Sequence, residues 1–361
     1  MHSSPPASPP SSPPDHTQRS AETDRWQSAW YGSRRWSFWL LPLTWLFILL
    51  SAIRRYVLLR WQQTTLATPV IVVGNITVGG TGKTPLLIAL VQWLQAQGYT
   101  PGVVSRGYGG QVATYPYLLT AESTAAQAGD EPVTIYQQTG CAVCVGPDRL
   151  AAARALEDQG CDLILSDDGL QHYRLGRDIE IAVVDGQRGV GNGWRLPVGP
   201  LREPISRLTT VDWVVVNSPA ANFVLPQLAD LYFIPMQIQA RSLVNLATGS
   251  EHQLSSIAES PVNAVAGIGN PQRFINTLSE SGIHAQLHAF PDHHAYTATD
   301  LVFDNVWPVV MTEKDAVKCK TFAQPNWYYL SIGANLPDAF WAAFAQRIER
   351  VMEQKKSRFG L

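Results

Sequence analysis

The sequence has few cysteines, almost no net charge and no internal repeat. Its 361 residues include four cysteines, too few for a disulfide framework. The 27 lysines and arginines nearly balance the 29 aspartates and glutamates, so no broad basic surface for nucleic acid is implied. No repeat of fixed period is present, which argues against a solenoid or a propeller. A chain of this length suits about two domains with sizeable cores.

Two of the cysteines, Cys141 and Cys144, have the spacing of metal and redox motifs, but no second pair follows them. Their neighbours Ala142, Val143 and Val145 are apolar and indicate a buried strand. We interpret the cysteines as small core residues, which suit a reducing cytoplasm.

Acidic residues are absent from residues 25–61. Six arginines flank an uncharged core over residues 36–53, and half of the 12 tryptophans lie in this segment. Arginine pairs with anionic lipid and tryptophan prefers the headgroup layer, so we predict a membrane-associated helix over 25–61 that lies in the inner leaflet. The core is just long enough to span a bilayer, although Pro42 interrupts it and the equally basic flanks leave orientation open. A spanning helix and a buried soluble helix are the alternatives.

The first 24 residues are rich in serine and proline and have almost no apolar content. We expect a disordered tail over 1–24. It does not have the pattern of a secretory signal, because no basic start leads into an apolar stretch.

A glycine-rich segment stands between an apolar β-branched run, 69–73, and a helix-like run, 85–91. Its residues are Thr77, Val78, Gly79, Gly80, Thr81, Gly82, Lys83 and Thr84. Strand, turn and helix in this order are the context that a phosphate-binding loop requires, although Thr77 stands where the first glycine belongs. Backbone N–H groups of such a loop close around phosphate oxygens at a helix N-terminus. Lys83 would reach the outer phosphates, and Thr84 would place its hydroxyl on Mg²⁺.

From residue 68 onward, apolar runs alternate with helix-like stretches. This rhythm predicts an α/β fold: a P-loop NTPase-like, mainly parallel sheet with helices on both faces. A Gly/Pro-rich stretch, 186–204, interrupts it and predicts a seam between domains. We therefore expect a P-loop kinase domain over 62–189, a linker over 190–203 and a second α/β domain over 204–361, with a C-terminal helix able to pack back on the first domain.

Two adjacent acids, Asp167 and Asp168, follow the apolar run 163–165. A carboxylate at the end of such a strand lies beside the phosphate loop and holds Mg²⁺ directly or through water. Neighbouring residues of a strand point to opposite sides, so the two acids would have separate tasks. A solvated turn is the alternative. Gln171 and His172 follow at once; the histidine would complete this site or be a structural residue.

Asp130 and Glu131 lie between the phosphate loop and these acids. Asp130 is placed to accept a proton from an attacking hydroxyl, and Glu131 to join the metal shell, although an acidic turn before proline is common. His293 and His294 follow Asp292; a histidine beside an acid relays or orients a proton. A metal site is the alternative for this triplet, but no matching cluster has ligand spacing.

Three arginines, Arg106, Arg149 and Arg202, lie in Gly/Pro-rich turns. Such arginines neutralise phosphate charge, and an ordinary surface role is the alternative for each.

Seven motifs follow one another along the chain. They are residues 75–85, Ser105-Arg106-Gly107-Tyr108-Gly109, Gly129-Asp130-Glu131-Pro132, Asp167-Asp168-Gly169-Leu170-Gln171-His172, Pro197-Val198-Gly199-Pro200-Leu201-Arg202-Glu203-Pro204, Phe290-Pro291-Asp292-His293 and Thr312-Glu313-Lys314-Asp315. In this order they resemble the tetraacyldisaccharide 4'-kinase family, the lipid A 4'-kinases of Gram-negative bacteria. The resemblance covers nearly everything from residue 25 to the end, and Thr77 in place of glycine is usual in that family. The tail before Ala21 is outside the family pattern.

The resemblance implies ATP-dependent phosphorylation of the 4'-hydroxyl of tetraacyldisaccharide 1-phosphate, which gives lipid IVA. It implies two α/β/α domains joined by a short linker, with the active site in the cleft between them. The implied cofactors are ATP and Mg²⁺, and the implied partner is an acylated glucosamine disaccharide lipid. The implied location is the cytoplasmic face of the bacterial inner membrane.

The resemblance also assigns roles to residues by motif match. It implies that Asp130 takes the hydroxyl proton, paired with His293, while Lys83 and Thr84 handle phosphates and Mg²⁺. The supporting site residues that it implies are Glu131, Asp167, Asp168, Arg149, Gln171, His172, Arg202 and Glu203.

Two other functions stay open from the sequence. The first is a membrane-associated P-loop ATPase switch; a GTPase is unsupported, because residues 214–217 continue as Ser218-Pro219 rather than into Asn-Lys-x-Asp. The second is a membrane-anchored binding module without catalysis, against which Lys83, Thr84 and the paired acids argue. The sequence does not settle acyl-chain preference, oligomeric state or the role of residues 312–315.

Overall fold

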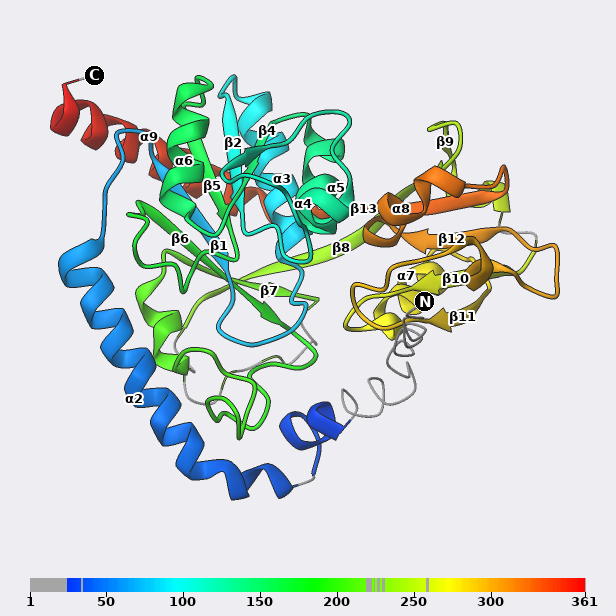
Figure 1. Ribbon diagram of the computed structural model, residues 1–361, viewed down its shortest axis with the longest axis horizontal. Coiled ribbons are helices and arrows are strands. Elements are labelled where there is room, and N and C mark those ends of the chain that lie inside the picture. The colour runs from blue at the N-terminus through cyan, green and yellow to red at the C-terminus, as the bar shows by residue number, and fades with distance from the viewer. Residues whose placement is uncertain are drawn as a thin grey trace, which may run out of the picture.

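The computed structural model describes residues 25–33, 35–218, 223, 225, 228, 231–257 and 260–360. The tail predicted for residues 1–24, and Arg34, lie outside these residues. A sheet of 13 strands runs through the molecule, and helices cover both of its faces (Figure 1).

Seven strands form what we call the P-loop half of the sheet. They are β1 (Val70–Gly74), β2 (Pro101–Ser105), β3 (Tyr117–Leu118), β4 (Ala142–Val145), β5 (Leu163–Asp167), β6 (Ile179–Asp185) and β7 (Trp213–Asn217). Their order is β7-β6-β1-β5-β2-β4-β3, and neighbours are parallel except for the last pair. Central parallel strands are covered on both faces, which explains their continuous apolar runs.

Successive residues of β1 contribute to two different cores, one on each face of the sheet. Ile71 and Val73 belong to one core, and Val70 and Val72 to the other. The helices of this half are α3 (Lys83–Ala96), α4 (Ala125–Ala128), α5 (Asp130–Thr139), α6 (Arg149–Asp158) and the 3₁₀ turn η3 (Ile205–Thr210). Residues of α3 and α5 pack in the first core, and residues of α6 pack in the second.

The C-terminal helix α9 (Asp338–Phe359) returns to the P-loop half. Its apolar side chains Phe340, Phe344 and Ile348 pack in the same core as Ile71 and Leu86. The end of the chain therefore covers the sheet beside α3.

The remaining strands form the distal half. They are β8 (Phe233–Asn245), β9 (Glu251–His252), β10 (Val262–Ala266), β11 (Ala285–Ala289), β12 (Val309–Thr312) and β13 (Trp327–Asn335). Its helices and turns are α7 (Pro271–Glu280), α8 (Glu313–Cys319), η5 (Leu254–Ile257), η6 (Ala298–Leu301) and η7 (Lys320–Phe322). β8 joins the two halves: its first residues pair in parallel with β7, and its remainder pairs antiparallel with β13.

Strand pairing differs in one respect from the predicted division at residues 190–203. β7 lies beyond that stretch, yet it pairs with β6 and extends the sheet of the P-loop half. The change of sheet direction falls within β8 instead, because this strand is long enough to serve both halves. The stretch itself contacts the N-terminal segment, where the backbone N–H of Val198 donates to Oγ1 of Thr44.

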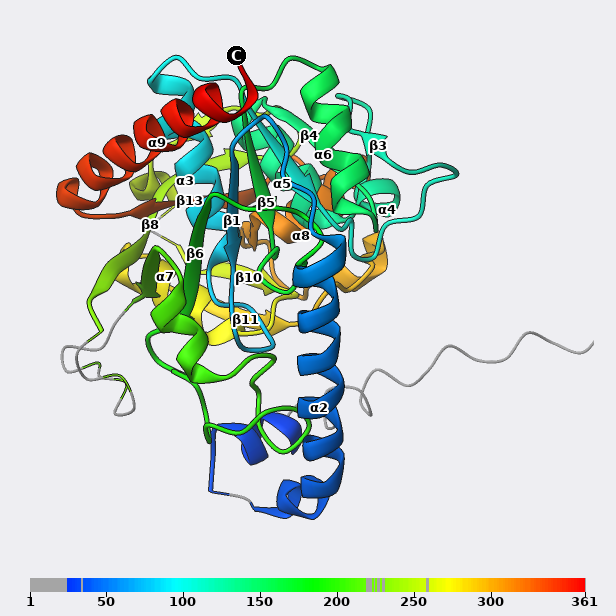
Figure 2. The same ribbon diagram turned by 90° about the vertical axis from the view of Figure 1, so that its left-hand side faces the viewer.

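The N-terminal segment forms a long helix along one edge of the molecule (Figure 2). It comprises η1 (Trp36–Leu40), α2 (Leu41–Val57) and a π-helical end, η2 (Leu58–Gln62). Pro42 lies in the first turn of α2, where its missing N–H costs no hydrogen bond, so it does not interrupt the helix. Residues 36–62 are long and apolar enough to cross a membrane, with mean hydropathy 1.8 and 11% burial of the most apolar window. This exposure does not match the buried soluble helix considered above.

Candidate active site

The phosphate-binding loop lies between β1 and α3, as the sequence predicts. Gly82 precedes α3 with a φ of +93°, and a side chain there would collide with Nδ2 of Asn217. That amide donates to the carbonyl of Thr81 at 3.0 Å, and Nδ2 of Asn75 donates to the carbonyl of Gly79 at 3.3 Å. Two asparagines thus hold the shape of the loop.

A large cleft opens beside the phosphate-binding loop, but not every residue predicted to hold phosphates faces it. Residues Gly79 to Thr84 line it, whereas Thr77 and Val78 do not. The backbone N–H of Val78 donates to the carbonyl of Pro200 at 2.9 Å, so this amide is already used. The phosphate-facing part of the loop is therefore its second half.

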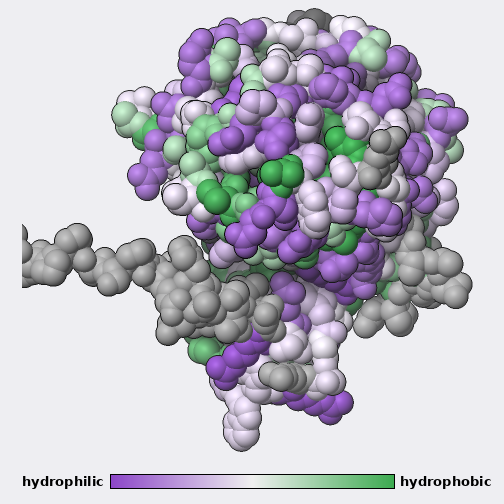
Figure 3. Space-filling model, turned by 90° about the vertical axis from the view of Figure 1, so that its right-hand side faces the viewer, coloured by the Kyte–Doolittle hydropathy of each residue, from purple (hydrophilic) through white to green (hydrophobic). Residues whose placement is uncertain are grey.

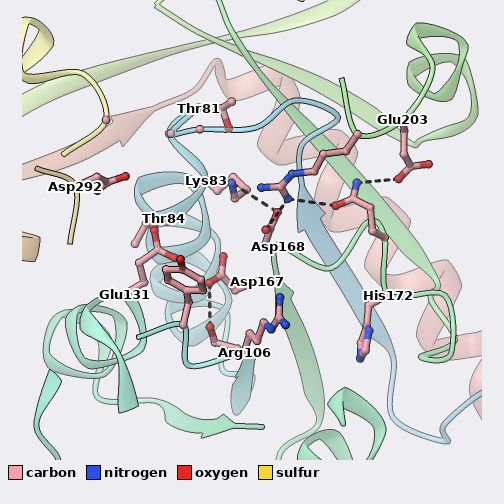
Figure 4. A pocket seen from close by; sticks show the side chains of 18 of the residues that line it. Thr81, Lys83, Thr84, Arg106, Glu131, Asp167, Asp168, His172, Glu203 and Asp292 are labelled. Carbon is pink, nitrogen blue, oxygen red and sulfur yellow. Dashed lines mark hydrogen bonds and ion pairs between the residues drawn. The ribbon is translucent and has the colours of Figure 1, made fainter. Parts of the chain in front are cut away.

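The two acids at the end of β5 have different partners (Figure 4). Oδ1 of Asp168 lies 3.6 Å from Nζ of Lys83, and its Oδ2 lies 2.8 Å from Nη1 of Arg202. Asp167 accepts a hydrogen bond from the hydroxyl of Ser105 at 3.1 Å, and its Oδ1 has no hydrogen-bond partner among the described residues. The prediction of separate tasks therefore has a structural basis.

These surroundings move the two pKa values apart. Burial, and then the carboxylates of Glu131 and Asp168, raise the pKa of Asp167 to about 6. Burial also opposes ionisation of Asp168, but the charges of Lys83 and Arg202 outweigh it and hold that pKa below its usual range. Asp168 is thus an anion at neutral pH, and a cation beside Asp167 would favour the ionised form of that carboxyl.

A magnesium ion suits this donor set. The described residues contain no group of three or more His, Cys, Asp and Glu side chains placed to hold a metal. Mg²⁺ is commonly bound by one or two carboxylates, water and substrate phosphates rather than by a full protein cage. The unpartnered oxygen of Asp167 and the hydroxyl of Thr84 supply such oxygens, and both residues line the cleft.

Asp130 and His293 form a pair between the two halves. Nδ1 of His293 lies 3.0 Å from Oδ2 of Asp130, and His293 has a φ of +60°, a backbone conformation that is uncommon for residues other than glycine. His293 lines the cleft, whereas Asp130 lies behind it and is 6% exposed. Burial alone would raise the pKa of Asp130, but the hydrogen bond with His293 and nearby lysine charges lower it to about 2. The same hydrogen bond raises the pKa of His293.

Glu131 is bound by a lysine that the sequence did not assign. Nζ of Lys314, in the first turn of α8, forms an ion pair with Oε1 of Glu131, and this charge lowers the pKa of Glu131. Lys318, one turn further along α8, lies 3.7 Å from Oδ2 of Asp130. Residues 312–315 were recognised as a motif without a role. In the structure they lie at the start of α8, opposite α5, where Lys314 pairs with Glu131.

The predicted supporting residues gather at the other end of the site. Nε2 of Gln171 donates to Oε1 of Glu203 at 2.8 Å. The backbone N–H of Arg149 donates to Nε2 of His172 at 3.3 Å, and Nη2 of Arg149 donates to the carbonyl of Asp167 at 2.9 Å. Burial, followed by the charge of Arg149, lowers the pKa of His172 to about 4, so this histidine is a neutral acceptor.

A cleft of about 1670 Å³ connects the phosphate-binding loop, the acids at the end of β5 and the supporting residues. Its lining includes the phosphate-binding loop, His293 and Lys314 of the distal half, and side chains of α2 such as Phe47 and Leu50. One continuous cavity thus extends from an apolar helix to a phosphate site.

Comparison with known proteins agrees with this geometry. A family model described as tetraacyldisaccharide-1-P 4'-kinase matches residues 36–349. The tetraacyldisaccharide 4'-kinase of Hahella chejuensis is 45% identical over 338 residues, covering 91% of this chain and 98% of that protein. Its counterpart from Methylobacillus flagellatus is 47% identical over 338 residues, covering 92% and 98%. The chain belongs to the tetraacyldisaccharide 4'-kinase family.

A solved structure of this family has the same architecture. LpxK from Aquifex aeolicus, crystallised in complex with ATP, is 25% identical, with a TM-score of 0.73 over 88% of this chain and 99% of that one. The predicted family, the P-loop NTPase-like fold class and the kinase activity in lipid A synthesis are confirmed. The predicted cofactors, ATP with the Mg²⁺ that such kinases use, are confirmed with them. The family assignment therefore favours a kinase over the two alternatives, an ATPase switch and a binding module without catalysis.

Proposed function

We propose that the Asp130–His293 pair takes the proton of the sugar 4'-hydroxyl while that oxygen attacks the γ-phosphorus of ATP and ADP leaves. The 3.0 Å contact between the two side chains carries this proposal. Asp130 is ionised at neutral pH, because its pKa is about 2, and holds Nδ1 of His293. The imidazole lines the cleft, where an acceptor hydroxyl can approach it. Such a pair contributes about 10²–10⁴-fold to a rate.

The other site residues have supporting roles in the same proposal. Lys83 and the loop amides would bind the phosphates, and Thr84 and Asp167 would hold Mg²⁺, which would supply positive charge to offset that of the transferring group. Asp168 keeps Lys83 and Arg202 in place through its two ion pairs. Glu131, predicted as a metal ligand, is paired with Lys314, and it could bind the metal only if this ion pair opened.

The lipid substrate requires the enzyme to work at a membrane, and α2 is the surface that suits this task. Its inner side is fixed to the body, where the hydroxyl of Ser51 accepts from Nη2 of Arg195 at 2.8 Å. Its outer side exposes a stripe of Leu46, Leu49 and Ile53, each more than half exposed. The distant face in Figure 3 is mostly polar, with apolar residues in small separate groups. We therefore place α2 in the cytoplasmic leaflet of the inner membrane, with basic flanks against anionic lipid.

Transfer of labelled phosphate from ATP to a tetraacylated disaccharide 1-phosphate, separated by thin-layer chromatography, tests the pair. Asp130→Asn and His293→Gln keep similar shapes, and both should lower kcat at least 100-fold at saturating lipid while ATP binding stays within threefold. His294→Gln, at a neighbouring residue without an assigned role in transfer, is the matched control. Near-normal turnover of both variants would remove the pair from the reaction.

A further inference from the structure

Two contacts join the loop after β6 to the beginning of α7. Nη2 of Arg273 lies 3.1 Å from Oδ1 of Asp185, and Nη2 of Arg188 donates to the carbonyl of Gly269 at 2.9 Å. Asp185 ends β6 in the P-loop half, whereas Arg273 lies on α7 in the distal half. The carboxylate is 3% exposed, so water and salt screen this ion pair less than a surface pair.

These contacts lie directly beside the phosphate-binding loop. A side chain added to Gly269 would come within 3.9 Å of the backbone nitrogen of Gly80. One added to Gly79 would come within 3.8 Å of Nη1 of Arg188. Arg273 lines the same cleft as these loop residues. The distal half therefore meets the phosphate-binding loop at this point.

The ion pair is poorly explained by folding stability alone. Nε of Arg273 and Oδ2 of Asp185 are buried, and neither has a hydrogen-bond partner within the described part of the chain. Oδ1 of Asp185 also accepts from the backbone N–H groups of Gln187 and Arg188, at 2.9 and 3.1 Å, so the desolvation cost that is not offset falls on the other carboxylate oxygen and on Nε of Arg273. Replacement of a buried ion pair by apolar residues is often neutral or stabilising, so stability alone does not explain the charges at this position.

We propose that the Asp185–Arg273 ion pair and the Arg188–Gly269 hydrogen bond form a latch that positions the distal half over the phosphate-binding loop. Arg273 and Arg188 are then positioning residues for phosphoryl transfer, and this role rests on the kinase activity. His293 comes from the distal half, so its distance from the γ-phosphoryl depends on where that half lies. A misplacement of about 1 Å costs on the order of 10²-fold in rate.

The latch differs from the Asp130–His293 contact in what it should change. Neither contact of the latch involves Asp130 or His293, so its loss should lower kcat without removing the base. It also does not close the phosphate-facing half of the loop. Binding of ATP to residues Gly79 to Thr84 should therefore survive its loss.

Arg273→Met in the full chain tests the latch, with Arg188→Met as a second variant. We expect kcat at saturating ATP and lipid to fall ten- to 100-fold, with less than threefold change in the Kd for ATP and the KM for lipid. Arg347→Met is the matched control: this arginine also pairs with an aspartate far away in sequence, Oδ1 of Asp212 at 3.0 Å, but outside the cleft. Its kcat should be unchanged.

A double-mutant cycle separates the pair from two independent effects. Asp185→Asn with Arg273→Met should lower kcat about as much as Arg273→Met alone, because either change breaks the same contact. Thermal unfolding by circular dichroism identifies any variant whose lower activity results from an unfolded protein. The latch would be overturned if the kcat losses of the two single variants multiplied in the double variant. A kcat loss no larger than that of Arg347→Met, or an effect confined to the Kd for ATP, would overturn it as well. Activity of the wild-type enzyme on lipid tests the kinase assignment separately.

Discussion

Nδ1 of His293 lies 3.0 Å from Oδ2 of Asp130, although 163 residues separate them in the chain. Asp130 begins α5 in the P-loop half, and His293 stands in a loop of the distal half. The pair therefore exists only when the two halves are placed correctly. Proton acceptance therefore depends on the same placement of the two halves that shapes the cleft for nucleotide and lipid.

The pH dependence of transfer should follow His293. The carboxylate of Asp130 raises the pKa of His293 above its ordinary value of about 6.5. Protonated His293 has no free acceptor nitrogen, so kcat/KM should fall as the pH drops through this raised pKa. Asp130→Asn removes the cause of the rise, and the acid limb of its residual activity should move to lower pH. An unmoved limb in a kcat/KM profile from pH 5 to 9 would show that another group controls it.

Asp167 and Asp168 should respond differently to loss of charge. Asp167→Asn should weaken the apparent affinity for Mg²⁺ at least tenfold, since the unpartnered oxygen of Asp167 is the proposed metal ligand. Asp168→Asn should mainly weaken ATP binding, because Lys83 and Arg202 lose the carboxylate that positions them. Titration of Mg²⁺ and of ATP against initial rate separates the two effects. Equal changes in both titrations for both variants would contradict separate tasks.

Local sequence predicted the phosphate-binding loop because each of its parts is specified by neighbours. A β-branched run, glycines that allow positive φ and a helix-forming run follow one another, and the structure has β1, the loop and α3 there. The acids at the end of β5 were predictable for the same reason. Such signals need no knowledge of distant residues.

Contacts between the halves were not predictable in this way. Lys314, Lys318 and Arg273 meet acids of the P-loop half only because β8 and β13 bring the distal half against it. Charged residues on short helices are usually solvated, so nothing in the local pattern marked Lys318 or Arg273, and Lys314 stood out only as part of a motif without a role. The sequence placed β7 in the second domain because this strand follows the Gly/Pro-rich stretch along the chain. Its pairing with β6 depends on hydrogen bonds to a distant segment, which chain order does not reveal.

Gly82→Ala should damage the phosphate-binding loop more than an ordinary glycine substitution. The φ of +93° is strained for alanine, at about 1–3 kcal/mol, and the added carbon would lie 2.2 Å from Nδ2 of Asn217. Gly98→Ala is the matched control, since its φ is +87° but no atom lies within 4 Å of the added carbon. Urea denaturation should show a larger loss of stability for Gly82→Ala, and ATP affinity should fall only in this variant. Equal losses would mean that Asn217 moves aside without cost.

The exposed stripe of α2 should carry membrane binding. Leu46, Leu49 and Ile53 have the i, i+3, i+7 spacing of one helix face, and none of them lines the cleft. Burial of each in lipid is worth about 1.5–3 kcal/mol, so replacing all three with serine should weaken binding to anionic vesicles at least 100-fold.

The triple variant separates membrane docking from chemistry. Its turnover should fall on lipid presented in vesicles and stay within threefold of wild type on lipid dispersed in detergent, because the cleft lining is intact. Serine at Val302 and Val306, which are 75% and 94% exposed outside α2, is the control for surface apolarity and should leave vesicle binding unchanged. Vesicle cosedimentation that does not distinguish the triple variant from this control would mean that α2 is not the docking surface.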